Sequence, residues 1–215
     1  MSMATRTKPR RLGRPPAVDS TVTRGRILTA ARRSFATRGY DATTNRDIAA
    51  EAGVTTGALY HYTRSKADLY GEVYAEVQDL VYGEFEKAFA HDTFRARFGA
   101  VLDAAVELNR RDPSLAGFVI GVSPEVHRHP ELRDKLRPMA RRTSTFLHRL
   151  VGDAVASGEL APDVEPAAVE DLLNAVLAGL ARFSNVTGDP DRHAAAAAVL
   201  HRLVDGTLLV ERADP

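Results

Sequence analysis

The chain of 215 residues contains no cysteine and no tryptophan. The lack of cysteine excludes disulfides, thiolate nucleophiles, cysteine-ligated zinc sites and thiol-based redox sensing. Long apolar runs are also missing, because the longest fall well short of the roughly 20 residues that a membrane helix needs. No apolar stretch follows the basic N-terminus, as one would in a signal peptide. We therefore expect a cytoplasmic protein with no membrane partner.

Signatures of common enzyme classes are absent from the sequence as well. It has no GxGxxG dinucleotide loop, no GxxxxGK[ST] phosphate loop, no GxSxG nucleophile elbow and no HExxH zinc motif. His127 and His129 stand two residues apart next to a proline, and this spacing favours loop histidines over metal ligands. The sequence therefore predicts a protein that is not an enzyme and that has no metal site and no cofactor.

Charge is distributed unevenly, although the formal net charge of the whole chain is only +1. Residues 1–70 contain 13 Lys and Arg against 5 Asp and Glu, whereas residues 71–215 contain 16 against 23. A positive end on an otherwise acidic chain indicates that this end meets a polyanion while the remainder serves another purpose.

The spacing of apolar residues predicts an all-α fold, because no run of alternating β-branched residues is bounded by turn signals. The last two helices are expected near residues 166–186 and 191–210, and Ser123-Pro124 is expected to separate two earlier ones. The expected organisation is a disordered basic arm (1–20), a domain of short helices (21–66) and a larger helical domain (67–215).

Two short helices on either side of Gly53 carry the functional chemistry. Thr44 and Asp47 are close to a capping box that opens the first helix, and Thr55 can cap the second, expected to run to about Tyr62. The glycine between them can adopt a positive φ, as the turn of a helix-turn-helix requires. In that motif the second helix enters the major groove of DNA by its N-terminal residues.

Side chains around these helix ends suit contacts with DNA. Hydroxyls can donate to phosphates or base edges, a glycine lets the backbone approach the duplex, and a lysine at a helix N-terminus attracts phosphate. The candidates on these grounds are Arg46, Thr55, Thr56, Gly57, Tyr60, His61 and Lys66. In the arm, Gly13-Arg14-Pro15 resembles a minor-groove hook that would insert Arg14, although a solvated tail attracted to phosphates is the alternative.

Three segments resemble one known family. They are GYDATT at residues 39–44, IAAEAGVTTGALYHY at residues 48–62 and SKADL at residues 65–69, and the resemblance covers residues 24–72. Together they are similar to the N-terminal domain of the TetR (tetracycline-repressor) family, and the later helices follow the family pattern more loosely. One position departs from it, because Thr63 stands where the family usually has an aromatic residue.

The resemblance implies a homodimeric transcriptional regulator, usually a repressor, that binds a pseudo-palindromic double-stranded DNA operator. It implies further DNA contacts at Thr44 and Asn45. It also implies that the larger domain binds a small-molecule effector and dimerises through a four-helix bundle made by the last two helices of each subunit.

Candidates for the effector pocket and the dimer interface follow from the helical spacing in the larger domain. Phenylalanines at inward positions and polar residues among apolar ones can line a cavity, but each can equally be an ordinary core residue. The pocket candidates are Phe85, Phe89, Phe98, Phe118, Phe146 and Asn174, with Asn109, His148 and Asn185 as further polar residues of this kind. The interface candidates are Leu173, Val176, Leu180, Val199 and Leu203.

Two other functions remain open from the sequence alone. A non-specific, nucleoid-type DNA binder would use the same basic end without preferring any operator. A helical ligand-binding protein or enzyme with a vestigial DNA-binding domain would bind or convert a small molecule and leave no footprint on DNA.

Overall fold

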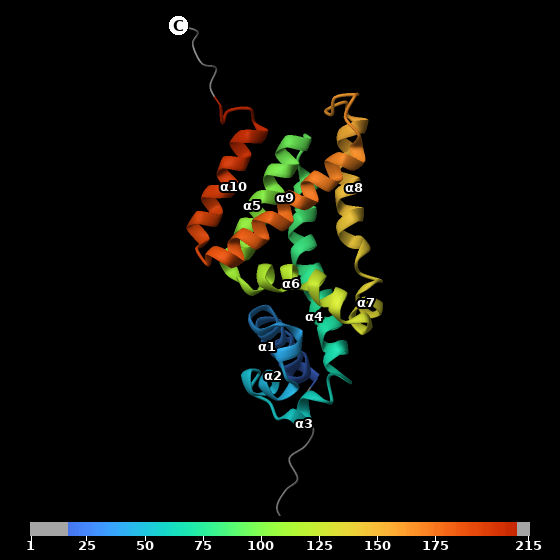
Figure 1. Cartoon of the computed structure of the whole chain (residues 1–215), viewed down its shortest axis with the longest axis vertical. Coiled ribbons are helices and arrows are strands. Elements are labelled where there is room, and N and C mark those ends of the chain that lie inside the picture. The colour runs from blue at the N-terminus through green and yellow to red at the C-terminus, as the bar shows by residue number, and fades with distance from the viewer. Residues whose placement is uncertain (1–16, 210–215) are drawn as a thin grey trace, which may run out of the picture.

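The computed structural model of the chain describes residues 17–209, and throughout that range its regular structure is helical (Figure 1), which confirms the all-α prediction. The basic arm expected at residues 1–20, with Arg14, lies outside the described residues as far as residue 16. Within residues 17–209, none of the helices combines the length and apolar character that crossing a bilayer requires. The elements are α1 (Ala17–Ala42), α2 (Asn45–Glu51), α3 (Thr56–Leu59), α4 (Lys66–Phe85), the 3-10 helix η1 (Glu86–Ala90), α5 (Phe94–Arg111), α6 (Ser114–Arg128), α7 (Pro130–Leu136), α8 (Arg141–Ala156), α9 (Pro166–Thr187) and α10 (Pro190–Val204).

The helices are divided between the two ends of an elongated molecule. In Figure 1, α1, α2 and α3 gather at one end, and α4 runs from them into the other end, where α5, α8, α9 and α10 lie. Helix α6 crosses the middle and packs against both α1 and α9. The helix-turn-helix is therefore joined to the larger domain by α4 and by the contact between α6 and α1.

Two hydrophobic cores correspond to these two ends. We call the first the N-terminal core. It combines α1–α4 with residues of α6 and α7, and its aromatic centre places Tyr70 between Phe35 and Phe118, with ring centroids 4.9 Å from each. The second, which we call the C-terminal core, is formed by the last part of α4 with α5, α8, α9 and α10. Its aromatic residues include Tyr82, Phe85 and Phe146.

A buried arginine ties the two ends together. Arg32 of α1 is only 5% exposed, and its guanidinium pairs with Glu76 of α4 at 3.1 Å and with Asp112. The same guanidinium donates to the hydroxyl of Ser114 at 3.0 Å. An arginine fork can satisfy several acceptors at once, so one side chain links α1, α4 and the start of α6.

Some helix ends differ from the sequence prediction. Helix α6 continues through Pro124, so the expected break at Ser123-Pro124 is wrong. Proline costs a helix interior about 3 kcal/mol or more, and we attribute the continuity to the packing of Val122 and Val126, on either side of Pro124, against the N-terminal core. Helix α10 ends at Val204 rather than near residue 210, because Gly206 follows with a φ of 69°, a left-handed conformation that terminates helices.

Candidate functional site

The first helix of the helix-turn-helix begins at a complete capping box, as the sequence predicts. The backbone N–H of Asp47 donates to the Thr44 hydroxyl at 3.2 Å, and the N–H of Thr44 donates to the Asp47 carboxylate at 3.3 Å. The hydrogen bond from the Thr44 side chain holds the pKa of Asp47 below its usual value. The carboxylate therefore stays ionised at neutral pH and fixes the start of α2.

The turn between α2 and α3 depends on Gly53. Its φ is 66°, which confirms the predicted positive φ. A Cβ at this position would lie 2.5 Å from a terminal nitrogen of Arg26, whose guanidinium donates to the carbonyls of Ala52 and Gly53. The backbone conformation therefore favours glycine, and a side chain at this position would also have to displace the Arg26 guanidinium.

The second helix is shorter than predicted and presents an exposed N-terminal end. The Thr55 hydroxyl caps α3 by accepting from the N–H of Ala58 at 3.1 Å, and regular helix ends at Leu59. Hydrogen-bonded turns continue as far as Thr63. Tyr60, directly after this helix, is 55% exposed, so its side chain is accessible to a partner.

The predicted DNA contacts that the structure describes fall into two groups by exposure. Those that lie exposed on the helix-turn-helix are Thr44, Arg46, Thr55, Gly57, Tyr60 and His61, and those that are half-buried are Asn45, Thr56 and Lys66. Arg14 lies outside the described residues. The fold therefore brings the candidates of α2, α3 and their caps to one end of the molecule, beside the N-terminus of α4 (Figure 1).

Lys66 has internal partners that the sequence did not reveal. Its ammonium group donates to the carbonyl of Tyr40 at 2.8 Å and to that of Thr43 at 3.1 Å, and it lies 4.2 Å from the centroid of the Tyr40 ring. An ammonium has three hydrogens, so these bonds leave one donor for a phosphate. Lys66 thus holds the N-terminus of α4 against the end of α1, and its contact with DNA stays a prediction.

Thr63, at the position where the resemblance leads us to expect an aromatic residue, is buried at 4% exposure. Its hydroxyl donates to the carbonyl of Ser65 at 3.0 Å. The side chain thus satisfies its own polar group and bonds to the residue that caps α4, because Ser65 accepts from the N–H of Asp68 at 3.0 Å. The short loop before α4 is ordered by these bonds in place of aromatic packing.

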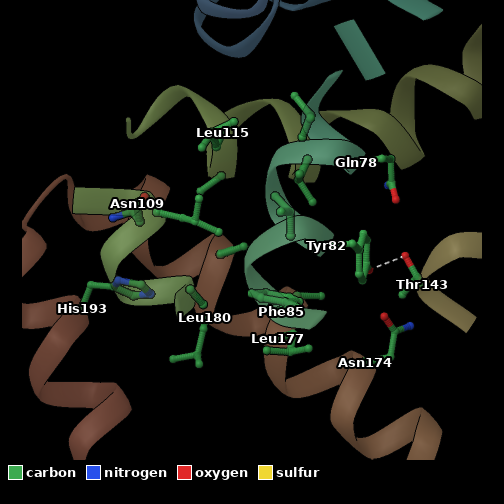
Figure 2. Close-up of a pocket in the computed structure, with 18 residues that line it drawn as sticks. Gln78, Tyr82, Phe85, Asn109, Leu115, Thr143, Asn174, Leu177, Leu180 and His193 are labelled. Atoms are coloured by element: carbon green, nitrogen blue, oxygen red, sulfur yellow. Dashed lines mark hydrogen bonds between the residues drawn. The ribbon is translucent and has the colours of Figure 1, made fainter. Parts of the chain in front are cut away.

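A mainly apolar cavity lies in the C-terminal core (Figure 2), and its wall comes from α4, α5, α6, α8, α9 and α10. Its apolar lining includes Val77, Phe85, Leu108, Leu177 and Leu180. Six polar residues share the wall, namely Gln78, Tyr82, Asn109, Thr143, Asn174 and His193. A concave apolar site with a few polar groups is the usual form of a small-molecule pocket.

Several of these polar groups are buried without a partner among the described residues. They are the side-chain oxygens of Gln78 and Asn109 and both ring nitrogens of His193, whereas the Tyr82 hydroxyl donates to Thr143 at 2.6 Å. Burial lowers the pKa of His193, which keeps the imidazole neutral at pH 7 with one donor and one acceptor nitrogen. An unsatisfied buried polar group costs free energy, so these atoms favour a ligand that would bond to them.

The sequence prediction of the cavity wall is only partly met. Phe85 and Asn174 line the cavity, but Phe89, Phe98, Phe118 and Phe146 do not. Their rings are used elsewhere: Phe118 in the N-terminal core, Phe98 stacked on Phe94, and Phe89 and Phe146 against each other. Gln78 and His193 were missed, although a polar residue at a position that a helix buries is the signal that would identify them.

The predicted interface residues differ in where they lie. Val199 and Leu203 of α10 are 50% and 55% exposed, whereas Leu173 is buried within the C-terminal core and Leu180 lines the cavity. Leu172 of α9 is also exposed, at 60%. Both α9 and α10 therefore present large apolar side chains to the surface.

Two family models match the chain. The model described as "Bacterial regulatory proteins, tetR family" matches residues 27–73, and the model described as "Tetracyclin repressor-like, C-terminal domain" matches residues 95–200. The HTH-type transcriptional regulator UidR of Escherichia coli (strain K12) is 25% identical over 151 residues, which cover 70% of this chain and 76% of UidR. The HTH-type transcriptional repressor KstR2 of Mycolicibacterium smegmatis is 41% identical over 64 residues, 30% of this chain and 31% of KstR2.

A solved structure has a similar fold over most of its length. It is the transcriptional regulator FadR from Bacillus subtilis in complex with stearoyl-CoA, which matches with a TM-score of 0.73 over 85% of this chain and 98% of FadR. The sequences are 18% identical, so the likeness shows a shared fold alone.

Proposed function

The chain belongs to the TetR family of bacterial regulatory proteins and is a DNA-binding transcriptional regulator, and from this premise we propose that it is a homodimeric repressor that a small molecule releases from its operator. The observation that carries this proposal is the course of α4. At its N-terminus Lys66 is bonded to the end of α1, and about three turns further on Val77 and Gln78 line the cavity. One rigid helix thus contacts both the DNA-reading end and the pocket.

The mechanism follows from the symmetry of a dimer. Two copies of α3 would enter successive major grooves of a pseudo-palindromic operator, with half-sites about 34–36 Å apart. A ligand that fills the cavity would displace α4 and change the spacing of the two α3 helices. A ligand can act only through its different affinities for the two arrangements, so operator DNA would weaken ligand binding by the same factor.

The chemistry of the cavity supports a mainly apolar effector with a few hydrogen-bonding groups. Its apolar surface would lie against Leu177 and Phe85, and its polar groups would reach Gln78, Asn109 and His193. Among proteins of similar fold, FadR binds stearoyl-CoA, and KstR2 of Mycobacterium tuberculosis is a ketosteroid transcriptional regulator. We therefore choose long-chain acyl-CoA and ketosteroids as the first probes.

The decisive experiment is fluorescence anisotropy of the purified protein on labelled DNA from upstream of its own gene and on scrambled DNA, at two salt concentrations. We expect a preference for the first DNA of about 1,000-fold or more. The variant Thr56→Ala should lower the specific affinity by about tenfold and leave non-specific affinity unchanged. Equal binding of both DNAs, lost together as salt rises, would contradict the proposal and indicate a non-specific binder.

Release is tested on the same complex. We expect an effective probe to restore the anisotropy of free DNA, and the variant Gln78→Leu to need more of that probe without a change in operator affinity. A variant that binds operator normally and responds normally would place the effector outside this cavity.

Dimerisation is tested by sedimentation. The exposed apolar side chains of α9 and α10 are the proposed interface, so a charge introduced among them should separate the subunits. We expect Leu203→Arg to sediment as a monomer. Leu80→Arg, on an exposed position of α4 that is 44% exposed, is the matched control and should remain a dimer. If both variants sediment as monomers, or both as dimers, the proposed location of the interface is wrong.

A further inference from the structure

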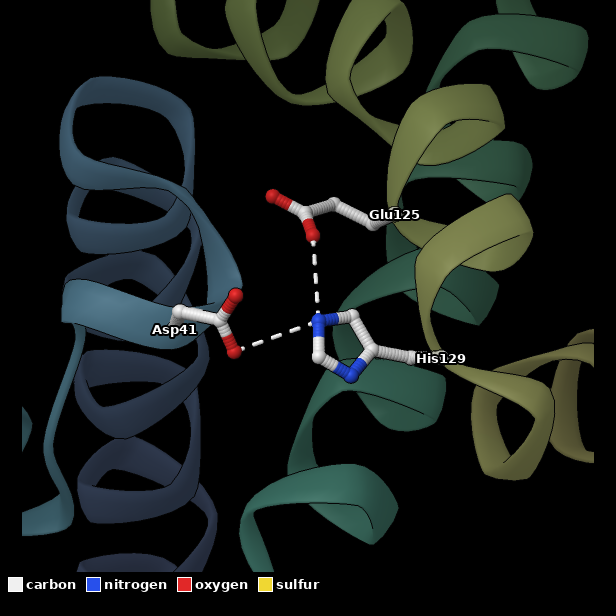
Figure 3. A group of neighbouring side chains, drawn as sticks. All are labelled: Asp41, Glu125 and His129. Atoms are coloured by element: carbon white, nitrogen blue, oxygen red, sulfur yellow. Dashed lines mark ion pairs between the residues drawn. The ribbon is translucent and has the colours of Figure 1, made fainter.

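Three side chains converge where the end of α1 meets α6, outside the helix-turn-helix and the cavity (Figure 3). Nε2 of His129 lies 3.2 Å from a carboxylate oxygen of Asp41 and 3.6 Å from Oε2 of Glu125. One donor atom from each of the three residues lies within 4.8 Å of the others. Asp41 belongs to the last residues of α1, whereas Glu125 lies on α6 and His129 directly follows it.

Glu125 is a buried carboxylate with one unused oxygen. Its residue is 5% exposed, and Oε1 accepts from the backbone N–H of Tyr40 at 3.1 Å and pairs with Arg128 at 3.1 Å. Oε2 has no hydrogen-bond partner among the described residues, and neither has Nε2 of His129, toward which it points (Figure 3). A buried carboxyl oxygen without a hydrogen-bond partner is costly, so its orientation toward a second unsatisfied atom indicates that something is held between them.

The other nitrogen of His129 faces a carboxylate as well. Nδ1 lies 3.4 Å from an oxygen of Glu131. Histidines that bind metals usually donate their second ring N–H to a carboxylate, which orients the ring and makes the ligating nitrogen more basic. The packing of the Tyr40 ring against the imidazole, with centroids 4.8 Å apart, restricts the ring further.

The spacing of the three donor atoms suits a metal ion. Zinc binds imidazole nitrogen and carboxylate oxygen at about 2.0–2.2 Å, so two ligands of a tetrahedral site lie about 3.3–3.5 Å apart. The two separations from Nε2 of His129, 3.2 Å to Asp41 and 3.6 Å to Glu125, bracket that value, and all three donor atoms lie within 4.8 Å of one another. An imidazole among the ligands favours a transition metal over Mg²⁺ or Ca²⁺.

We propose that Asp41, Glu125 and His129 bind one first-row divalent transition metal ion, Zn²⁺ being the representative, and that water completes the coordination. The ion would join the end of α1 to the end of α6, and so add a second link, beside that of Lys66 on α4, at the end of α1. This function is separate from the binding of effector in the cavity.

The sequence alone did not indicate this site, because it drew attention to His127 and His129. Those two residues do not converge. The partner of His129 is Glu125, which is four residues earlier and therefore on the same side of α6. The third ligand comes from a residue 84 positions before Glu125 and is placed by the packing of α1 on α6.

The test is metal titration of the full-length protein after removal of any affinity tag. Co²⁺ serves as the probe because its visible absorption reports coordination, and Zn²⁺ should displace it. We expect one ion per chain. Loss of this binding in Asp41→Asn, at a position whose side chain is 65% exposed and whose change will not disturb folding, would support the site. Glu131→Gln should weaken binding by about 10- to 100-fold.

Matched controls separate this site from adventitious binding to other histidines. His127→Gln alters the neighbouring histidine, and His201→Gln alters a histidine that faces a single carboxylate, Asp103, at 3.1 Å. Both variants should bind one ion as the wild type does. Absence of stoichiometric binding in the wild type would overturn the proposal, and so would binding that Asp41→Asn leaves unchanged or that Mg²⁺ supports equally well.

A second measurement tests whether the bound ion stabilises the contact between α1 and α6. Zinc at a hundredfold excess over its dissociation constant should raise the thermal midpoint of the wild type by roughly 5 to 10 °C. The same addition should leave Asp41→Asn unchanged. A wild type that binds zinc at Asp41 without any rise in its thermal midpoint would overturn the role of the ion in joining the helices.

Discussion

The N-terminal and C-terminal cores of this protein are built from similar residues but differ in how completely side chains fill them. In the N-terminal core, the Tyr70 ring packs edge-on against Phe35 and tilted by 40° against Phe118, and α2 and α4 begin at side-chain caps. The C-terminal core encloses a cavity whose wall carries the unpartnered polar atoms of Gln78, Asn109 and His193. The comparison indicates that the interior of the helix-turn-helix end is closely packed, whereas a ligand would complete the packing of the other end.

The strongest test of this difference removes one large side chain from each core. Phe118→Ala should lower the free energy of unfolding by about 3–5 kcal/mol, because it leaves a void among close-packed rings. Leu177→Ala should cost clearly less, because part of its side chain already faces empty space and has few contacts to lose. Urea unfolding of both variants measures the two values, and equal losses would remove the distinction between the cores.

The next effect concerns the anchor of α4. Lys66→Ala removes two charge-assisted hydrogen bonds to the carbonyls of Tyr40 and Thr43, so we expect a loss of about 1.5–3 kcal/mol in the free energy of unfolding. Lys87→Ala breaks only an exposed pair with Glu84 and should cost less than about 1 kcal/mol. If Lys66 also contacts a phosphate, the salt slope of DNA binding should fall by about one. An unchanged slope would limit Lys66 to its structural role.

Replacing a small side chain by a larger one in each core tests the same difference in packing from the opposite direction. Ala31 is fully buried in the N-terminal core, so Ala31→Leu should cost about 1–3 kcal/mol through overpacking. Ala105 lines the cavity, and Ala105→Leu should fill space at little cost in stability while it reduces the response to an effector. Thermal unfolding and operator release measure the two effects. A large destabilisation by Ala105→Leu would show that the cavity has no room to spare.

The smallest expected effect is a pH dependence from His193. Burial lowers its pKa in the folded state below the ordinary value of 6.5, so the unfolded chain binds more protons at acidic pH. Its contribution to stability is therefore complete above about pH 6.5 and is lost as the pH falls below that value. We expect the thermal midpoint of the wild type to fall more between pH 7.5 and 5.5 than that of His193→Leu. Parallel profiles would contradict this assignment.

Local features of the fold could be predicted because neighbouring residues determine them. The capping box of Thr44 and Asp47 and the positive φ of Gly53 depend on a few adjacent residues and were predicted correctly. The break at Pro124 was predicted wrongly, because tertiary packing of α6 outweighs the local preference of proline.

The cavity wall could be predicted only in part, because it depends on contacts between distant helices. Helical spacing shows which face of a helix turns inward, but not which neighbour meets it or where space remains. Phe85 and Phe118 both lie on inward faces, yet the first lines the cavity and the second lies in the other core. The hydrogen-bond partners of Lys66 could not be predicted for the same reason, because the two carbonyls lie more than 20 residues earlier in the chain.

The contribution of α6 and α7 to the N-terminal core has a consequence for protein engineering. Phe118, Leu132 and Leu136 complete the packing around Tyr70, yet they follow residue 66 by some fifty residues or more. A fragment cut at residue 66 would therefore lack part of its own interior. Operator preference should be transferable between relatives by grafting positions such as Arg46 and Thr56, whereas exchange of the whole N-terminal segment would leave mismatched surfaces inside the molecule.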